Sequence, residues 1–415
     1  MRPDDAERIA EFHRALSLET VHFRYFSGLA RLPPPLLARF THVDFARDMG
    51  LVAELHGRVI GLASYHRDGT SDTAEVAFVI ADAQQGRGLG TLLLEVLAEL
   101  ARERGVTRFR ADTLLANRAM LRVFADAGFE IEREPDREVV HVRFPLAVTA
   151  RARAASERRE HLAEARSIAH LLAPRSIALL GESSALAARV FELGFRGSLC
   201  DQLRALPTGV DLALFSGDSA RAPAIVAACA DAGAHALVLG PLAGAPPSAE
   251  LAAFDRELRI AARRNGMRLL GPDSLGVVNT APDVALCAAV VSPGPAAGGL
   301  ALACDSSGAG AALLQQALAE GVGISSFASL GRRADVSVND LLQYWQDDAA
   351  TRAVALGVAD VGNPAKFARI AARVGERVPI HALAGDGGAL GSLLAGCGVK
   401  LWRTPAELLA AARRE

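Results

Sequence analysis

The feature that most constrains this chain is an apolar strand that runs directly into a glycine-spaced turn and then into a helix. Residues 75–80 are typical of a strand, residues 85–90 read Gln-Gly-Arg-Gly-Leu-Gly, and an amphipathic stretch covers residues 91–103. Free backbone N–H groups at the start of such a helix, together with the helix dipole, favour an anion. Glycine lets the backbone approach a phosphate closely. The turn therefore predicts a pyrophosphate site, although a tight helix entry without a ligand is the alternative, and the spacing is not the Gly-x-Gly-x-x-Gly of dinucleotide folds.

Length and composition limit the classes of protein to which the chain can belong. With 415 residues, about three domains are expected. A hydrophobic content of 51% excludes wholesale disorder, and a net charge of −2 gives no field that would attract nucleic acid or an anionic membrane surface. No apolar run is long enough for a membrane span or a signal peptide. We therefore expect a cytoplasmic protein with neither nucleic acid nor a membrane as a partner.

Cysteine and histidine spacing predicts no metal site and no disulfide framework. The five cysteines are isolated, without a CxxC pair. The histidines near the N-terminus form neither HxxxH nor HxH spacings.

The distribution of strands and helices predicts an α/β protein of three parts. Residues 1–148 mix strands and helices in a way that suits one α/β domain, and residues 149–172 are rich in Ala, Arg and Glu, as in a helical linker. From residue 173, short apolar strands alternate with Ala-rich helices, the pattern of a parallel sheet in a Rossmann-like domain. The Pro- and Gly-rich segment 292–299 marks a further boundary, so the predicted domains are 173–291 and 292–415.

A second motif, one strand and one helix after the turn, gives the first part of the chain a family resemblance. Residues 117–129 read Asn-Arg-Ala-Met-Leu-Arg-Val-Phe-Ala-Asp-Ala-Gly-Phe. Together with the turn, this stretch resembles the acyl-CoA site of the GNAT acetyltransferase superfamily. The resemblance implies a GNAT fold and acetyl-CoA as the donor. It implies that the donor contacts Phe78, Val79, Ile80, Gln85, Gly86, Arg87, Gly88, Leu89, Gly90, Thr91, Asn117 and Phe124.

Two further resemblances concern the subfamily and the rest of the chain. Residues 22–26, 36–45 and 51–54 resemble protein lysine acetyltransferases that carry an acyl-CoA-synthetase-like region. Residues 175–181, 268–278, 331–344 and 362–367 look like the CoA-binding and flavodoxin-like succinyl-CoA-ligase modules of NDP-forming acyl-CoA synthetases.

Amide formation from a thioester requires a base, because a lysine with a pKa near 10.4 is almost fully protonated at pH 7. In the acetyltransferases that this chain resembles, a glutamate at the position of Glu75 is the general base. An ion pair at a solvated strand edge is the alternative role for this carboxylate. Many relatives place a tyrosine four residues before the Gly-Phe pair as a general acid, but this chain has Phe124 there, and its ring cannot donate a proton.

The ligase-like region lacks the residues that ligase chemistry needs. The Gly-rich loop after its first strand is short, at residues 181–184. The phosphorylatable histidine loop is missing, and His381 is expected within a strand instead. We therefore expect no acyl-CoA synthetase activity and a regulatory or scaffold role, with surfaces that allow a homo-oligomer.

The sequence thus predicts an acetyl-CoA-dependent N-acetyltransferase that modifies protein lysines and uses no metal. A small-molecule amine acetyltransferase and a non-catalytic acyl-CoA-sensing protein remain the alternatives.

Overall fold

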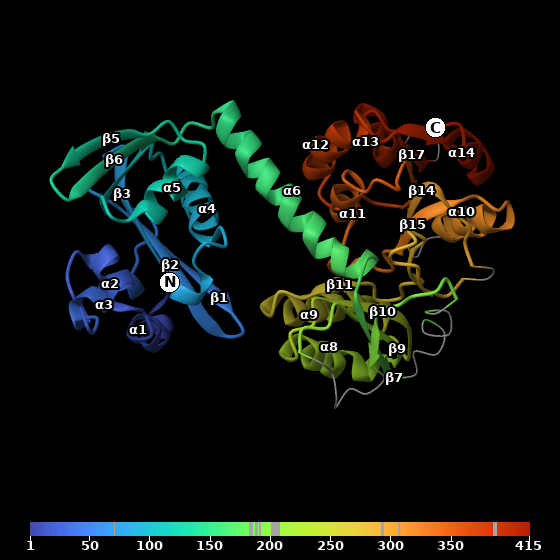
Figure 1. Cartoon of the computed structure of the whole chain (residues 1–415), viewed down its shortest axis with the longest axis horizontal. Coiled ribbons are helices and arrows are strands. Elements are labelled where there is room, and N and C mark those ends of the chain that lie inside the picture. Colours follow the sequence, from blue (N-terminus) through green and yellow to red (C-terminus); the bar gives the residue numbers. More distant parts are fainter. Residues whose placement is uncertain are drawn as a thin grey trace. The chain divides into compact units, whose positions relative to one another are not determined.

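The structure is a computed structural model (Figure 1). It describes residues 1–69, 71–181, 186, 190, 192–200, 208–291, 294–305, 308–384 and 388–415. They form two compact units, residues 1–160 and 161–415.

The first unit is built on a six-stranded sheet with the order β1-β2-β3-β4-β6-β5. Neighbouring strands are antiparallel except for β3 and β4, which are parallel. The strands are β1 (Asp48–Leu55), β2 (Arg58–Arg67), β3 (Thr73–Ile80), β4 (Arg108–Leu114), β5 (Glu132–Asp136) and β6 (Val139–Pro145).

Helices cover this sheet through apolar residues at helical spacing. Leu94, Leu97 and Ala98 of α4 are fully buried against strand residues such as Phe109 and Val142. The N-terminal helices pack with Val59, Leu62 and Val79 in a second cluster that contains Ile9 and Phe40. The helices of this unit are α1 (Ala6–Arg14), α2 (Leu18–Tyr25), α3 (Pro34–Thr41), α4 (Leu89–Glu103) and α5 (Arg118–Asp126).

The predicted linker is a helix of 23 residues, α6 (Ala150–Leu172). Its first part belongs to the first unit, where Arg159 forms an ion pair with Glu95 and its guanidinium donates to the carbonyl of Asp126 at 2.7 Å. Its last turns belong to the second unit, where Ile168 and Leu171 are fully buried.

The second unit contains two sheets that share one apolar cluster. The first sheet is parallel throughout, with the order β11-β10-β9-β7-β8. Its elements are β7 (Ser176–Gly181), β8 (Ser198–Cys200), β9 (Leu212–Asp218), α8 (Ala222–Asp231), β10 (Ala236–Ala243), α9 (Ser248–Arg264) and β11 (Arg268–Leu270).

The other sheet has seven strands in the order β13-β12-β15-β14-β16-β17-β18 and is parallel except at β12, which is antiparallel to both neighbours. Its strands are β12 (Gly276–Asn279), β13 (Leu286–Ala289), β14 (Ala297–Cys304), β15 (Ile324–Ser329), β16 (Ala353–Gly357), β17 (Ile380–Leu383) and β18 (Lys400–Trp402). The helices are α10 (Gly308–Ala319), α11 (Val338–Trp345), α12 (Pro364–Gly375), α13 (Ala389–Gly396) and α14 (Pro405–Ala412).

The predicted strands and helices of the described residues are present, and the structure adds short strands that the sequence did not reveal. These are β5, β8, β12, β13 and β18. Strands β12 and β13 precede residue 292, but they belong to the seven-stranded sheet, whose other strands all follow that residue. The division between residues 291 and 292 therefore remains a proposal. Among the described residues, no helix has the length and apolar character needed to cross a bilayer.

Candidate active site

A divergence of two parallel strands opens the centre of the first sheet. β3 and β4 are paired only from Thr73 with Arg108 to Glu75 with Arg110, although both strands continue beyond these pairs. On its other side β3 remains paired with β2 along its length, so only the edge that faces β4 is open. Backbone N–H and C=O groups on an open strand edge need hydrogen-bond partners, and an extended ligand can supply them.

The opening between these strands forms part of a cavity of about 410 Å³. Its wall includes β3 from Glu75 to Ile80, β4 residues such as Thr113, and residues of α2 and α5. The hydroxyl of Thr113 is buried and has no hydrogen-bond partner among the described residues. The cavity therefore combines an apolar wall with polar groups that a ligand can satisfy.

The glycine-spaced turn lies at one end of this cavity. Gly86 and Gly88 have φ angles of 73° and 85°, where a side chain would strain the backbone. The first amide of the turn to bond back along α4 is that of Leu92, which donates to the carbonyl of Gly88 at 3.1 Å. The amides of residues 86–91 therefore lie at the N-terminus of α4, before the first backbone hydrogen bond of the helix.

Side chains of the turn divide between the cavity and solvent. Gln85 lines the cavity, and its Nε2 donates to Thr20 Oγ1 at 3.0 Å and to the carbonyl of Ile80 at 3.1 Å. Leu89, Gly90 and Thr91 also line the cavity. Arg87 belongs to the same turn, but its side chain is exposed and does not contribute to the wall.

The two residues expected from the second motif also lie on the cavity wall. Asn117 caps α5, because its Oδ1 accepts from the amide of Met120 at 3.1 Å. Phe124 is only 1% exposed and packs against Phe78 and Phe144. Its ring therefore forms part of the core as well as the wall.

Glu75 stands where β3 and β4 begin to separate, and it lines the same cavity. Its Oε2 lies 3.4 Å from Nη2 of Arg110, and the two side chains are 53% and 51% exposed. A pair this exposed contributes little to stability. The carboxylate thus faces both the cavity and a cation.

An open strand edge, backbone amides at a helix start and a carboxylate line one cavity, and this combination is what an acyl-CoA-dependent transferase requires. The comparisons with known proteins agree. The profile of the Acetyltransferase (GNAT) family matches residues 17–129, and that of the Succinyl-CoA ligase like flavodoxin domain matches residues 297–413.

Similar proteins support both halves of this assignment. The chain is 33% identical to Acetyltransferase PA5475 of Pseudomonas aeruginosa over 147 residues, which are 34% of this chain and 79% of that protein. It is 36% identical to Acetyltransferase Pat of Mycolicibacterium smegmatis over 32% of this chain and 40% of that protein. The alpha subunit of the ADP-forming acetate–CoA ligase I of Pyrococcus furiosus is 26% identical over 52% of each chain. The chain thus spans about half or less of the last two relatives.

The chain belongs to the GNAT acetyltransferase family, and its first unit is an acyltransferase fused to a divergent succinyl-CoA-ligase-like region. The predicted fold class and family resemblance are confirmed. The roles of the individual site residues remain predictions.

Sequence reasoning missed most of the wall that α2 and β4 provide. Thr20, Phe23, Arg24 and Phe26 of α2 and its C-cap line the cavity, as does Asp112 of β4. Phe26 is 43% exposed, so its ring lies at the surface and not in the core. The sequence signal is the aromatic and basic run at residues 22–26, in which Arg24 fits either a surface that selects a protein acceptor or a charged helix face.

The second unit places His381 within a strand, as predicted. The side chain is 1% exposed, and its Nδ1 accepts from Nε1 of Trp402 at 3.0 Å. Burial lowers the pKa of this imidazole. A buried, hydrogen-bonded histidine is poorly placed for phosphoryl transfer. Both loops in which ligase features are missing, at residues 181–184 and near 385–387, lie largely outside the described residues.

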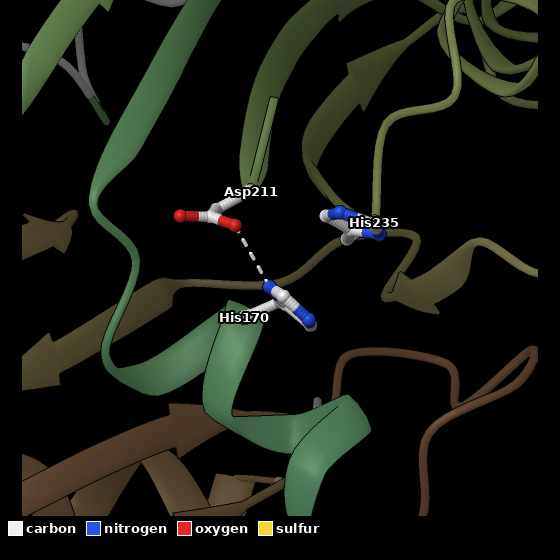
Figure 2. Close-up of side chains that lie close together, drawn as sticks. All are labelled: His170, Asp211 and His235. Atoms are coloured by element: carbon white, nitrogen blue, oxygen red, sulfur yellow. Dashed lines mark hydrogen bonds and ion pairs between the residues drawn. The ribbon is translucent and has the colours of Figure 1, made fainter. Parts of the chain in front are cut away.

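One cluster of potential metal ligands was not recognised from the sequence. Figure 2 shows His170, Asp211 and His235, whose possible ligand atoms lie within 4.8 Å of one another. Nδ1 of His170 donates to Asp211 Oδ1 at 2.9 Å, and the two imidazole rings stack at 4.2 Å. A metal lies in the plane of each imidazole that binds it, so two stacked rings would have to turn to share one ion. The observed arrangement is that of a hydrogen-bonded, stacked cluster, and the expectation of a metal-free enzyme remains a prediction.

Proposed function

We propose that the first unit transfers the acetyl group of acetyl-CoA to lysine side chains of a protein, with Glu75 as the general base. The observation that carries the proposal is the separation of β3 from β4 beyond Glu75, which brings this carboxylate, the open strand edge and the glycine-spaced turn onto one cavity. The resemblance of residues 22–26, 36–45 and 51–54 to protein lysine acetyltransferases supports a protein acceptor.

The donor is bound along the wall in this proposal. The backbone edge at Phe78, Val79 and Ile80 pairs with the extended arm, while the amides of residues 86–91 hold the diphosphate. Asn117 and Phe124 contact the donor from α5, and Arg87 attracts its phosphates from solvent.

In the chemical step Glu75 accepts a proton from the ammonium group of the acceptor, directly or through water. The neutral amine then attacks the thioester carbonyl, and backbone N–H groups near Phe78 stabilise the oxyanion. As the carbon–sulfur bond breaks, the nitrogen of the new amide loses its extra proton to water. The CoA thiolate leaves unassisted or takes a proton from water, because Phe124 has none to give.

Two matched variants test the role of Glu75 in the full chain. Glu75→Gln keeps the shape of the side chain but cannot accept the proton, so kcat should fall by about 10²-fold or more while acetyl-CoA still binds. Arg110→Gln breaks the same ion pair from the other side, and kcat should change by less than about threefold. Release of CoA thiol in the presence of an amine gives the rate. If both variants lose the same activity, Glu75 acts only through its ion pair.

The ligase-like region has, in our proposal, a scaffold or regulatory role, including self-association. The buried state of His381 supports the loss of ligase chemistry. Incubation of the full chain with acetate, CoA and ATP should yield no acetyl-CoA, whereas its formation would contradict the proposal. A cytoplasmic location fits the use of acetyl-CoA.

A further inference from the structure

A guanidinium without a carboxylate partner lines the active-site cavity. Arg24 lies near the end of α2, is half-buried and forms part of the cavity wall. Its guanidinium lies 5.1 Å from the centre of the Tyr25 ring. Among the described residues, none forms a hydrogen bond or an ion pair with it.

Three acidic residues line the cavity. Those of β3 and β4 are directed elsewhere, and the third, Asp126, lies at the end of α5. Glu75 pairs with Arg110, and Asp112 Oδ1 accepts from Nδ1 of His141 at 2.7 Å. Burial lowers the pKa of Arg24, and the charge of Arg39 on α3 lowers it further, although Tyr25 and Glu75 oppose this change. A half-buried cation without a counter-ion is unfavourable, so an anion that enters the cavity gains more from Arg24 than from an exposed arginine.

The position of Arg24 along α2 indicates which part of the reaction complex it serves. The start of α2 is tied to the segment before the glycine-spaced turn, because Ser17 and Thr20 donate to Asp82 at 2.5 and 2.7 Å. Arg24 is one turn further along, and it lines the same cavity as Glu75. The cation is therefore near the general base of the proposed function, where the acceptor amine arrives.

We propose that Arg24 binds a carboxylate of the acceptor, so that the enzyme prefers amines that carry an acidic group close to the reacting nitrogen. This inference rests on the proposed function and adds the chemical class of the acceptor. Two sources supply the same chemistry: an acidic residue beside the target lysine of a protein, and the carboxylate of a small amino acid. The planar guanidinium can bind either one through two parallel hydrogen bonds.

The test measures kcat/KM of the full chain for matched acceptors. One arm uses short peptides with a single lysine flanked by glutamate, glutamine or arginine. The other arm compares free lysine with cadaverine, which lacks the carboxylate. We expect at least a tenfold preference for the acidic member in one arm, and that arm identifies the source.

Arg24→Met keeps a long, unbranched side chain at this position but removes the charge that lies over the Tyr25 ring. It should abolish the preference by lowering kcat/KM for the acidic acceptor about tenfold or more, while the neutral acceptor reacts as before. Arg24→Lys should restore part of the preference. Arg14→Met, which removes an exposed arginine of α1, is the matched control and should leave both rates unchanged.

The outcomes separate the inference from the function on which it rests. If wild-type protein acetylates no amine in either arm, the proposed function fails. If it acetylates acidic and neutral acceptors equally well, or if Arg24→Met lowers both equally, the function stands and the inference is wrong. The inference is also wrong if Arg24→Met weakens acetyl-CoA binding without changing the acceptor preference, because Arg24 then serves the donor.

Discussion

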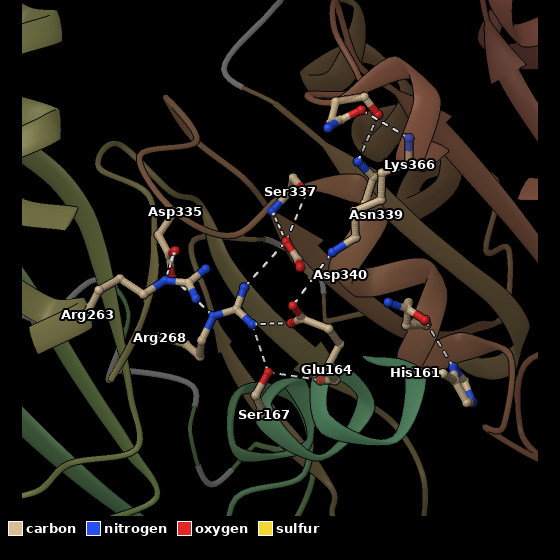
Figure 3. Close-up of polar contacts among 12 residues, drawn as sticks. His161, Glu164, Ser167, Arg263, Arg268, Asp335, Ser337, Asn339, Asp340 and Lys366 are labelled. Carbon is tan, nitrogen blue, oxygen red and sulfur yellow. Dashed lines mark hydrogen bonds and ion pairs between the residues drawn. The ribbon is translucent and has the colours of Figure 1, made fainter. Parts of the chain in front are cut away.

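Removal of the arginine at the centre of a buried charge cluster should strongly destabilise the second unit. Figure 3 shows Arg268 of β11 among the carboxylates of Glu164, Asp335 and Asp340. Its nearest nitrogens lie 2.5, 3.1 and 3.4 Å from their oxygens, and its side chain is 5% exposed. Burial opposes the charge, but the three carboxylates raise the pKa of Arg268 above its ordinary value. The cluster also fixes the end of α6, which carries Glu164.

The expected loss in the free energy of unfolding depends on the buried carboxylates that lose their cation in the variant. In Arg268→Met the carboxylates of Asp335 and Asp340, 1% and 7% exposed, lose their shared cation. Breaking a buried pair typically costs about 3–5 kcal/mol. Asp335 keeps Arg263 at 2.5 Å, and Lys366 lies 3.6 Å from Glu164. We therefore expect the lower end of that range, a loss of about 3 kcal/mol in the free energy of unfolding.

Tryptophan fluorescence during urea unfolding is the appropriate assay, because both tryptophans of the chain, Trp345 and Trp402, belong to the second unit. Arg413→Met is the matched control, since it removes an ion pair with Glu320 whose side chains are 44% and 31% exposed. That change should cost less than about 1 kcal/mol.

A double-mutant cycle tests the electrostatic origin of the effect. Asp340→Asn should be less destabilising in the Arg268→Met background than alone, because it then removes an unpaired buried charge, and the coupling should exceed about 1 kcal/mol. The reasoning is refuted if Arg268→Met costs no more than Arg413→Met, or if the two changes in the cluster are additive.

Three further predictions concern individual groups. Gly88→Ala should raise the KM for acetyl-CoA and destabilise the first unit by about 1 kcal/mol, as measured by steady-state kinetics and unfolding, because φ is 85° at this residue. The hydrogen bond and charge of Asp112 raise the pKa of His141, so this pair stabilises the fold below pH about 6.5 and the stabilisation is lost as the pH rises through the folded-state pKa. An NMR titration should show that pKa falling in Asp112→Asn, and an unchanged value would contradict it. Burial raises the pKa of Cys229 and Cys304 to about 12, so mass spectrometry should find both unmodified by iodoacetamide at pH 8 until the chain is unfolded.

The parts of the site that the sequence predicted are those set by local geometry. The strand, turn and helix from Glu75 to Glu103 follow one another directly, and Gly86 and Gly88 mark the backbone angles that the turn requires. Periodicity and glycine spacing encode such features within a short stretch. For the same reason α6 was recognised as one continuous helix.

The features that the sequence did not reveal depend on contacts between distant residues. β12 is a fully buried run of four residues, and it becomes a strand through pairing of Val277 with Ala328 and of Val278 with Phe327, about fifty positions later. The position of α2 on the cavity depends on bonds from Ser17 to Asp82, 65 residues away. In the sequence alone, Arg24 is equally compatible with a surface that selects a protein acceptor and with a charged helix face.

The surroundings of two arginines distinguish a charge that stabilises the fold from a charge that a ligand could neutralise. The pKa of Arg268 is raised because three carboxylates surround the buried guanidinium, and the charge is satisfied within the fold. Burial lowers the pKa of Arg24, and Arg39 lowers it further, while Glu75 on the wall of the same cavity is paired with Arg110. Among the described residues, no carboxylate pairs with Arg24 to offset the free-energy cost of its desolvation. An anionic acceptor would provide this partner. The same residue type thus stabilises the second unit and, in our proposal, selects the substrate of the first.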